Sequence, residues 1–115
     1  MNIDFRNNKL KKCCNERASG VKEWGQQIAN KVFQRLVELR AAANLSEISH
    51  LPPPRCHIVE GIRKDCFAVD TVHPKRLLFK INQDPIPKLE DGSVDRKQVT
   101  SIKIWEVEDY HGKQK

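Results

Sequence analysis

Apolar and polar residues alternate along the second half of the chain, in segments separated by turn-forming residues. Three segments, 65–72, 75–82 and 99–109, repeat with the period of two that is typical of half-buried strands. In the middle segment, Leu77, Phe79 and Ile81 share one face, and Arg76 and Lys80 share the other. Shorter strands are expected at 1–5 and 55–60. The pattern therefore predicts a small sheet with one apolar face.

A different period, typical of helices, occupies the first half of the chain. Segments 9–17 and 21–43 carry apolar residues three and four positions apart, which predicts two amphipathic helices. We expect the break between them at residues 18–20, with Ser19 as the N-cap of the second helix. The apolar stripe of the second helix consists of Val21, Trp24, Ile28, Val32, Leu36, Leu39 and Ala43.

The order of these elements is strand, helix, helix, and then three or four strands. Successive strands joined by short turns pair antiparallel, and helices cover one face of such a sheet. We therefore expect a single α+β domain over residues 1–115. An N-terminal strand and a helical hairpin would pack on one face of a small, mainly antiparallel sheet. Residues 83–97, rich in Pro, Asp and Gly, are expected to form a long and mobile hairpin excursion.

Charge and cysteine content narrow the range of functions. The net charge of +6 favours a polyanionic partner, although a merely soluble basic protein is an equal alternative. Of that charge, +5 falls within the first 45 residues, which contain nine basic and four acidic residues. The four cysteines lack a Cys-x-x-Cys spacing, so we expect reduced thiols in a cytosol rather than a metal site. Neither a membrane span nor a signal peptide is expected.

Several residues with proton-transfer chemistry are expected to meet on the polar sheet face. The closing strand ends in Asp109, Tyr110 and His111, and His57 lies in the first strand after the prolines. With Arg76 nearby, such groups suit metal-free RNA cleavage, which needs a base, an acid and a cation for the phosphate. Each has a structural alternative as a packed or solvated side chain. This arrangement requires a strand register that brings His111 to the side of Arg76.

Four segments in order resemble the HigB branch of the RelE/ParE toxin superfamily. Residues 56–64 resemble its His-x-x-x-Gly-x-Arg segment, and the following strand, 65–72, also matches. Residues 75–80 resemble its arginine-bearing strand, and residues 107–113 resemble its Asp-Tyr-His ending. The resemblance covers nearly the whole chain. It implies a RelE/ParE-like fold and a type II toxin that cleaves mRNA in the ribosomal A site.

The resemblance also implies roles and partners. His57 and His111 would be acid and base, Asp109 would orient or assist, Tyr110 would contact the RNA, and Arg76 would stabilise the phosphate. Further phosphate contacts would come from Arg63, Lys64 and Lys80. No metal or cofactor is expected. The partners would be the ribosome, mRNA and a helix-turn-helix antitoxin of the HigA type, in the cytoplasm and without a membrane.

Two features depart from this family pattern. Glu60 stands where many relatives carry a basic residue, which removes a positive charge from that turn. The 83–97 excursion is longer than the family's tight hairpin and carries more acidic than basic residues, so we expect it to contact an antitoxin or nothing. The alternatives are a ParE-like inhibitor of DNA gyrase without catalytic activity and a basic nucleic-acid-binding domain.

Overall fold

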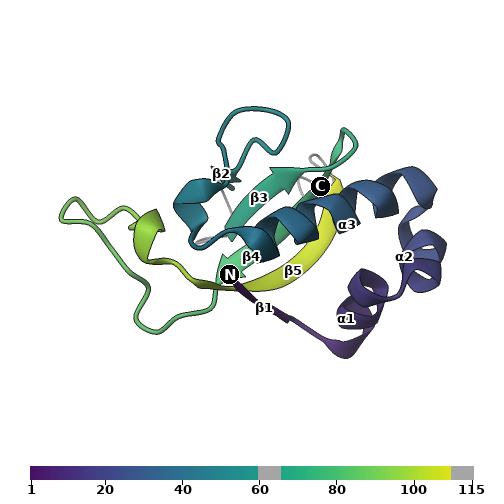
Figure 1. The fold of residues 1–115 in the computed structure, drawn as a ribbon, viewed down its shortest axis with the longest axis horizontal. Helices are drawn as coiled ribbons and strands as arrows, with labels where there is room; N and C mark the ends of the chain where they lie inside the picture. The colour runs from purple at the N-terminus through teal and green to yellow at the C-terminus, as the bar shows by residue number, and fades with distance from the viewer. Residues whose placement is uncertain (60–65, 110–115) are drawn as a thin grey trace.

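Over residues 1–59 and 66–109, the protein forms an open five-stranded mixed sheet with three helices against it (Figure 1). The computed structural model describes residues 1–59 and 66–109, apart from the side chain of Asp109. The strand order is β1-β5-β4-β3-β2, and every neighbouring pair is antiparallel except β1 and β5. The predicted α+β class is thus confirmed. The elements are β1 (Asn2–Phe5), α1 (Asn8–Asn15), α2 (Arg17–Trp24), α3 (Gln26–Ala41), β2 (His57–Ile58), β3 (Cys66–Asp70), β4 (Lys75–Ile81) and β5 (Ser101–Asp109).

The main core lies between α3 and one face of the sheet, which α3 crosses in Figure 1. Val32, Leu36 and Leu39 of α3 are buried there against the sheet. Phe67 of β3 and Phe79 of β4 stack with ring centroids 5.9 Å apart. The predicted apolar sheet face is therefore confirmed, and we call it the covered face. The opposite face is called the distal face.

The helix boundaries differ from the prediction. Asn7 is the N-cap of α1, because its side chain accepts a hydrogen bond from the Leu10 amide at 2.8 Å. The predicted break at 18–20 is wrong, since Ser19 lies inside α2. The breaks fall instead at Glu16, which is extended, and at Gly25, whose φ of 84° glycine adopts at no steric cost. Among residues 1–59 and 66–109, no helix is long and apolar enough to cross a membrane.

Gly20 permits close packing of the helices rather than interrupting them. A Cβ atom there would lie 2.6 Å from the carbonyl oxygen of Cys13 and 2.8 Å from the Phe33 ring. Neither distance is sterically acceptable, so any larger residue would push α2 away from α1 and α3. The sequence signal of a helix-breaking glycine thus reflects tertiary packing here.

The connection between β4 and β5 packs on the body of the domain. The Gln83 side chain bridges its two ends, since its Oε1 accepts from the Thr100 amide at 2.8 Å and its Nε2 donates to the Gln98 carbonyl at 3.1 Å. Ile86 and Val94 pack against the main core. The excursion therefore extends the core beyond the end of the sheet.

All four cysteines are buried free thiols. Burial raises the pKa of Cys14 to about 12 and that of Cys56 to about 11. Because the thiolate is the reactive form, burial and the raised pKa disfavour thiolate chemistry at these two residues at neutral pH. They act as small apolar side chains.

Candidate active site

Rows of paired residues cross the distal face. Directly paired residues of neighbouring strands project to the same side of a sheet, so the register identifies each row. The first row is Asp70–Arg76–Glu108, the second is His57–Ala68–Leu78–Glu106, and the third is Cys66–Lys80–Lys103–Asp4. The first row and the β2 end of the second row together hold Asp70, Arg76, Glu108 and His57.

His57 and Arg76 meet across β3. The Nε2 atom of His57 lies 3.3 Å from Nη1 of Arg76, although the two residues belong to different rows. The residue paired with His57 on the intervening strand is Ala68. Its small side chain leaves room for the imidazole to lean toward β4. The structure thus brings together two of the residues singled out in the sequence.

The hydrogen bonds of His57 define its tautomer. Nδ1 lies 2.6 Å from the Arg55 carbonyl oxygen, which only accepts hydrogen bonds, so Nδ1 carries the proton. In the neutral ring, Nε2 then holds the lone pair and accepts from the Arg76 guanidinium. The ring is therefore fixed at one nitrogen and presents its basic nitrogen to the distal face.

The environment of His57 favours this neutral form. Burial lowers the pKa of His57 below its ordinary 6.5, and the positive charges of Arg55 and Arg76 lower it further. The hydrogen bond to the Arg55 carbonyl and the charge of Asp70 act in the opposite direction without reversing the shift. At neutral pH His57 is thus a proton acceptor.

Arg76 lies between two acidic residues of its row. Asp70 is its partner on β3 and Glu108 is its partner on β5. Arg76 and Glu108 are 7% and 8% exposed, so two opposite charges occupy adjacent buried positions. Removing one partner of a buried pair of opposite charges leaves the other charge uncompensated, which is strongly destabilising. Glu108 was not singled out in the sequence, because only the register of β5 distinguishes it from Asp109, the partner of Lys75.

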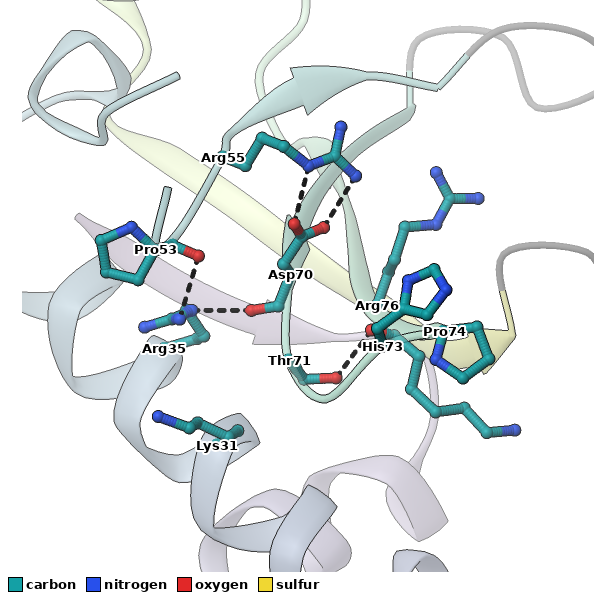
Figure 2. Close-up of a pocket in the computed structure, with 10 residues that line it drawn as sticks. Lys31, Arg35, Pro53, Arg55, Asp70, Thr71, His73, Pro74 and Arg76 are labelled. Carbon is teal, nitrogen blue, oxygen red and sulfur yellow. Dashed lines mark hydrogen bonds and ion pairs between the residues drawn. The ribbon is translucent and has the colours of Figure 1, made fainter. Parts of the chain in front are cut away.

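Arg55 orients the carbonyl group that binds His57. Its guanidinium makes a bidentate ion pair with Asp70, at 2.7 and 2.9 Å (Figure 2). Its φ of 47° lies in the left-handed region, which non-glycine residues adopt at a cost. No sequence signal identified Arg55, because the ion pair depends on the path of the proline loop.

Arg35 joins α3 to that loop and to the end of β3. Its Nε donates to the Asp70 carbonyl at 2.7 Å and its Nη2 to the Pro53 carbonyl at 3.1 Å, as Figure 2 shows. Its Nη1 lies 3.1 Å from Glu38, and the residue is 2% exposed. The sequence did contain a signal, since Arg35 lies within the apolar stripe between Val32 and Leu39.

Lys80 occupies a different part of the distal face from the His57–Arg76 pair. It lies four residues from Arg76 along β4, or about 13 Å at roughly 3.3 Å per residue. Its Nζ is 4.1 Å from the centroid of Trp105, and the Arg6 guanidinium lies 5.2 Å from the same ring. Two cations and an indole thus form a separate cluster. The sequence did not reveal this role of Trp105.

The other predicted site residues lie outside the described part of the chain. Arg63, Lys64, Tyr110 and His111 belong to residues 60–65 and 110–115, as does Glu60. Asp109 is described by its backbone alone, which ends β5 and pairs with Lys75, outside the row that holds Arg76. His57, Arg76 and Lys80 are therefore the predicted site residues whose side chains can be placed.

Metal binding and relationship to known proteins add two further findings. Among the described residues, no group of three or more His, Cys, Asp or Glu side chains could hold a metal ion. No protein-family model matches this chain, and no curated protein sequence is significantly similar to it.

Proposed function

We propose that this protein is an endoribonuclease that cleaves mRNA on the ribosome, as the toxin of a type II toxin–antitoxin system. The observation that carries this proposal is the contact between His57 and Arg76, whose Nε2 and Nη1 atoms lie 3.3 Å apart. A base and a phosphate-binding cation in contact are two of the three groups that metal-free RNA cleavage requires.

In the proposed reaction, His57 Nε2 removes the proton of a ribose 2′-hydroxyl. The 2′-oxygen forms a bond to the adjacent phosphorus, and Arg76 stabilises the negative charge that develops on the phosphoryl oxygens. The bond from phosphorus to the 5′-oxygen breaks, and the leaving oxygen takes up a proton. The products are a 2′,3′-cyclic phosphate and a 5′-hydroxyl. His111 is the candidate for the acid.

The remaining residues would support this centre. Glu108, the buried register partner of Arg76 on β5, would hold the Arg76 guanidinium in place. Asp109 would assist proton transfer, and Tyr110 would contact the RNA. Further phosphates of the RNA backbone would be bound by Arg63, Lys64 and Lys80.

The proposed setting is the bacterial cytoplasm. The net charge of +6 suits a ribosomal RNA surface, and the basic residues of the first 45 positions would contribute most of that attraction. A helix-turn-helix antitoxin of the HigA type would neutralise the toxin. The 83–97 excursion is a candidate contact for it.

The test is inducible expression in a bacterial host, with growth followed and mRNA 5′ ends mapped. We expect wild type to arrest growth and to produce new 5′ ends within codons. His57→Ala should lower the cleavage rate on programmed ribosomes by about 10²-fold, a typical effect of losing a general base. His50→Ala, an exposed loop histidine, is the matched control.

Other outcomes would contradict the proposal. Full toxicity of a folded His57→Ala/His111→Ala double variant would exclude the acid and base assignment. DNA damage with intact transcripts would favour a gyrase inhibitor. RNA binding without cleavage or growth arrest would favour a nucleic-acid-binding domain.

A further inference from the structure

A basic pocket lies beside the His57–Arg76 pair, at the turn between β3 and β4. Its volume is about 320 Å³, and it is lined by α3, the proline loop, the turn and the first residues of β4. Figure 2 shows Lys31 on the α3 side and His73 on the turn side. Arg76 lines the pocket as well, so the pocket adjoins the proposed cleavage centre. The sequence assigned no role to His73.

Part of the positive charge around this pocket is already paired with acidic side chains of the protein. Arg55 is bound to Asp70, and Arg35 is bound to Glu38 and to two carbonyl groups. These groups form the rigid wall of the pocket. They are not the groups that would attract a ligand.

Two lysines supply further positive charge. The nearest partner of Lys31 Nζ is the neutral Gln34 amide oxygen at 3.5 Å. Among the described side chains, no carboxylate forms an ion pair with Lys31 or Lys75. Lys75 is the register partner of Asp109, whereas Lys31 comes from another element. With the imidazole of His73, the lysines create a concave surface that attracts an anion.

We propose that this pocket holds the backbone phosphate of a nucleotide adjoining the one that is cleaved. The inference rests on the proposed function, because an RNA chain whose reacting phosphate lies at Arg76 would continue directly into the pocket. The volume falls in the range of small-ligand sites and admits a phosphate together with its ribose. Lysine ammonium groups bind phosphate as point charges, which suits a backbone contact without base selectivity.

The experiment compares two charge-matched double variants of the full chain. Lys31→Ala/Lys75→Ala removes the pocket lysines. Lys88→Ala/Lys97→Ala removes two exposed lysines of the 83–97 excursion. Binding of a fluorescent trinucleotide, 2′-O-methylated so that it cannot be cleaved, is measured over a range of salt concentrations. We expect the pocket variant to bind about tenfold more weakly and its logarithmic salt slope to fall by about 0.7, the value for one single-strand phosphate contact.

Inorganic phosphate provides a second probe that does not depend on RNA. Amide resonances of Thr71, His73 and Lys75 should shift on titration of wild type with phosphate, and the shifts should disappear in the pocket variant. Equal losses of trinucleotide affinity in both double variants, or no loss in either, would overturn the inference. The absence of phosphate-induced amide shifts in wild type would also overturn it. Cleavage by wild type with these negative results would leave the nuclease intact and exclude the pocket. Phosphate shifts in a protein that cleaves no RNA would retain the pocket and exclude the nuclease.

Discussion

The two faces of the sheet hold their residues in different ways, and β4 shows the contrast in two adjacent positions. Phe79 on the covered face and Leu78 on the distal face are both 0% exposed. Phe79 joins a cluster that includes three helices, whereas Leu78 contacts a small group that includes Cys66, Ala68 and Trp105. The covered face is maintained by apolar volume. The distal face is maintained mainly by hydrogen bonds and paired charges, so its geometry depends on individual contacts.

The largest expected effects on stability come from truncating Phe79 and Leu78 to alanine. Phe79→Ala should lower the free energy of unfolding by about 4 kcal/mol, because it leaves a cavity in the main core. Leu78→Ala should cost about 2 kcal/mol, near the lower limit for such a truncation, because its cluster is small. Urea unfolding of both variants measures the difference. Equal losses would show that the two faces contribute alike to stability.

Arg35 is the point where the two faces depend on each other. Arg35→Met should cost about 2 kcal/mol, since it leaves the buried carbonyl groups of Asp70 and Pro53 without their donor. The proline loop then loses its attachment to α3, and the Arg55 carbonyl that orients His57 should shift. Arg40→Met, on the exposed side of α3, is the control. If Arg35→Met lowered stability without changing the NMR resonances of His57, the proline loop would not determine the position of His57.

The sequence predicted the covered face far better than the distal face. Alternation in β4 placed Leu77, Phe79 and Ile81 inward because burial of apolar area selects one face regardless of detailed contacts. The same pattern placed Arg76 and Lys80 together on the distal face, yet they lie in separate clusters. His57 and Arg76 were both identified as chemical groups, but their contact depends on the register and on a small residue, Ala68, between them.

The missed residues share a physical reason. Arg55 and Glu108 act through partners that are distant in sequence, and a shift of one residue in register would replace Glu108 by its neighbour. The helix breaks were missed because Gly20 serves packing and Gly25 serves backbone conformation, two roles that look identical in sequence. Long-range contacts of this kind carry no local signal.

Arg55 allows the distal-face ion pair to be separated from backbone strain. Arg55→Gln should lower the free energy of unfolding by about 1 kcal/mol, the upper range for an ion pair whose side chains are partly exposed. Arg55→Gly should cost less, although it removes the same ion pair, because glycine adopts a φ of 47° without steric cost. Thermal unfolding of the two variants shows which of them is less stable. A larger loss for Arg55→Gly would show that the backbone at this position is not strained.

The smallest expected effect is the pH response of His57, which tests whether the distal face holds the ring neutral. Because burial and two neighbouring arginines lower its pKa, NMR titration should place the midpoint below 6.5. Arg76→Gln removes one of these charges and should raise the midpoint toward the ordinary value.

The same shift predicts a pH dependence of stability. Between the lowered pKa and 6.5 the unfolded chain binds the proton more readily than the folded protein. The contribution of His57 is therefore fully present above pH 6.5 and is lost as pH falls through the folded-state value. His57→Gln should flatten this part of the stability profile. A midpoint at or above 6.5 would mean that acids on the distal face outweigh burial, and His57 would then suit the role of acid better than that of base.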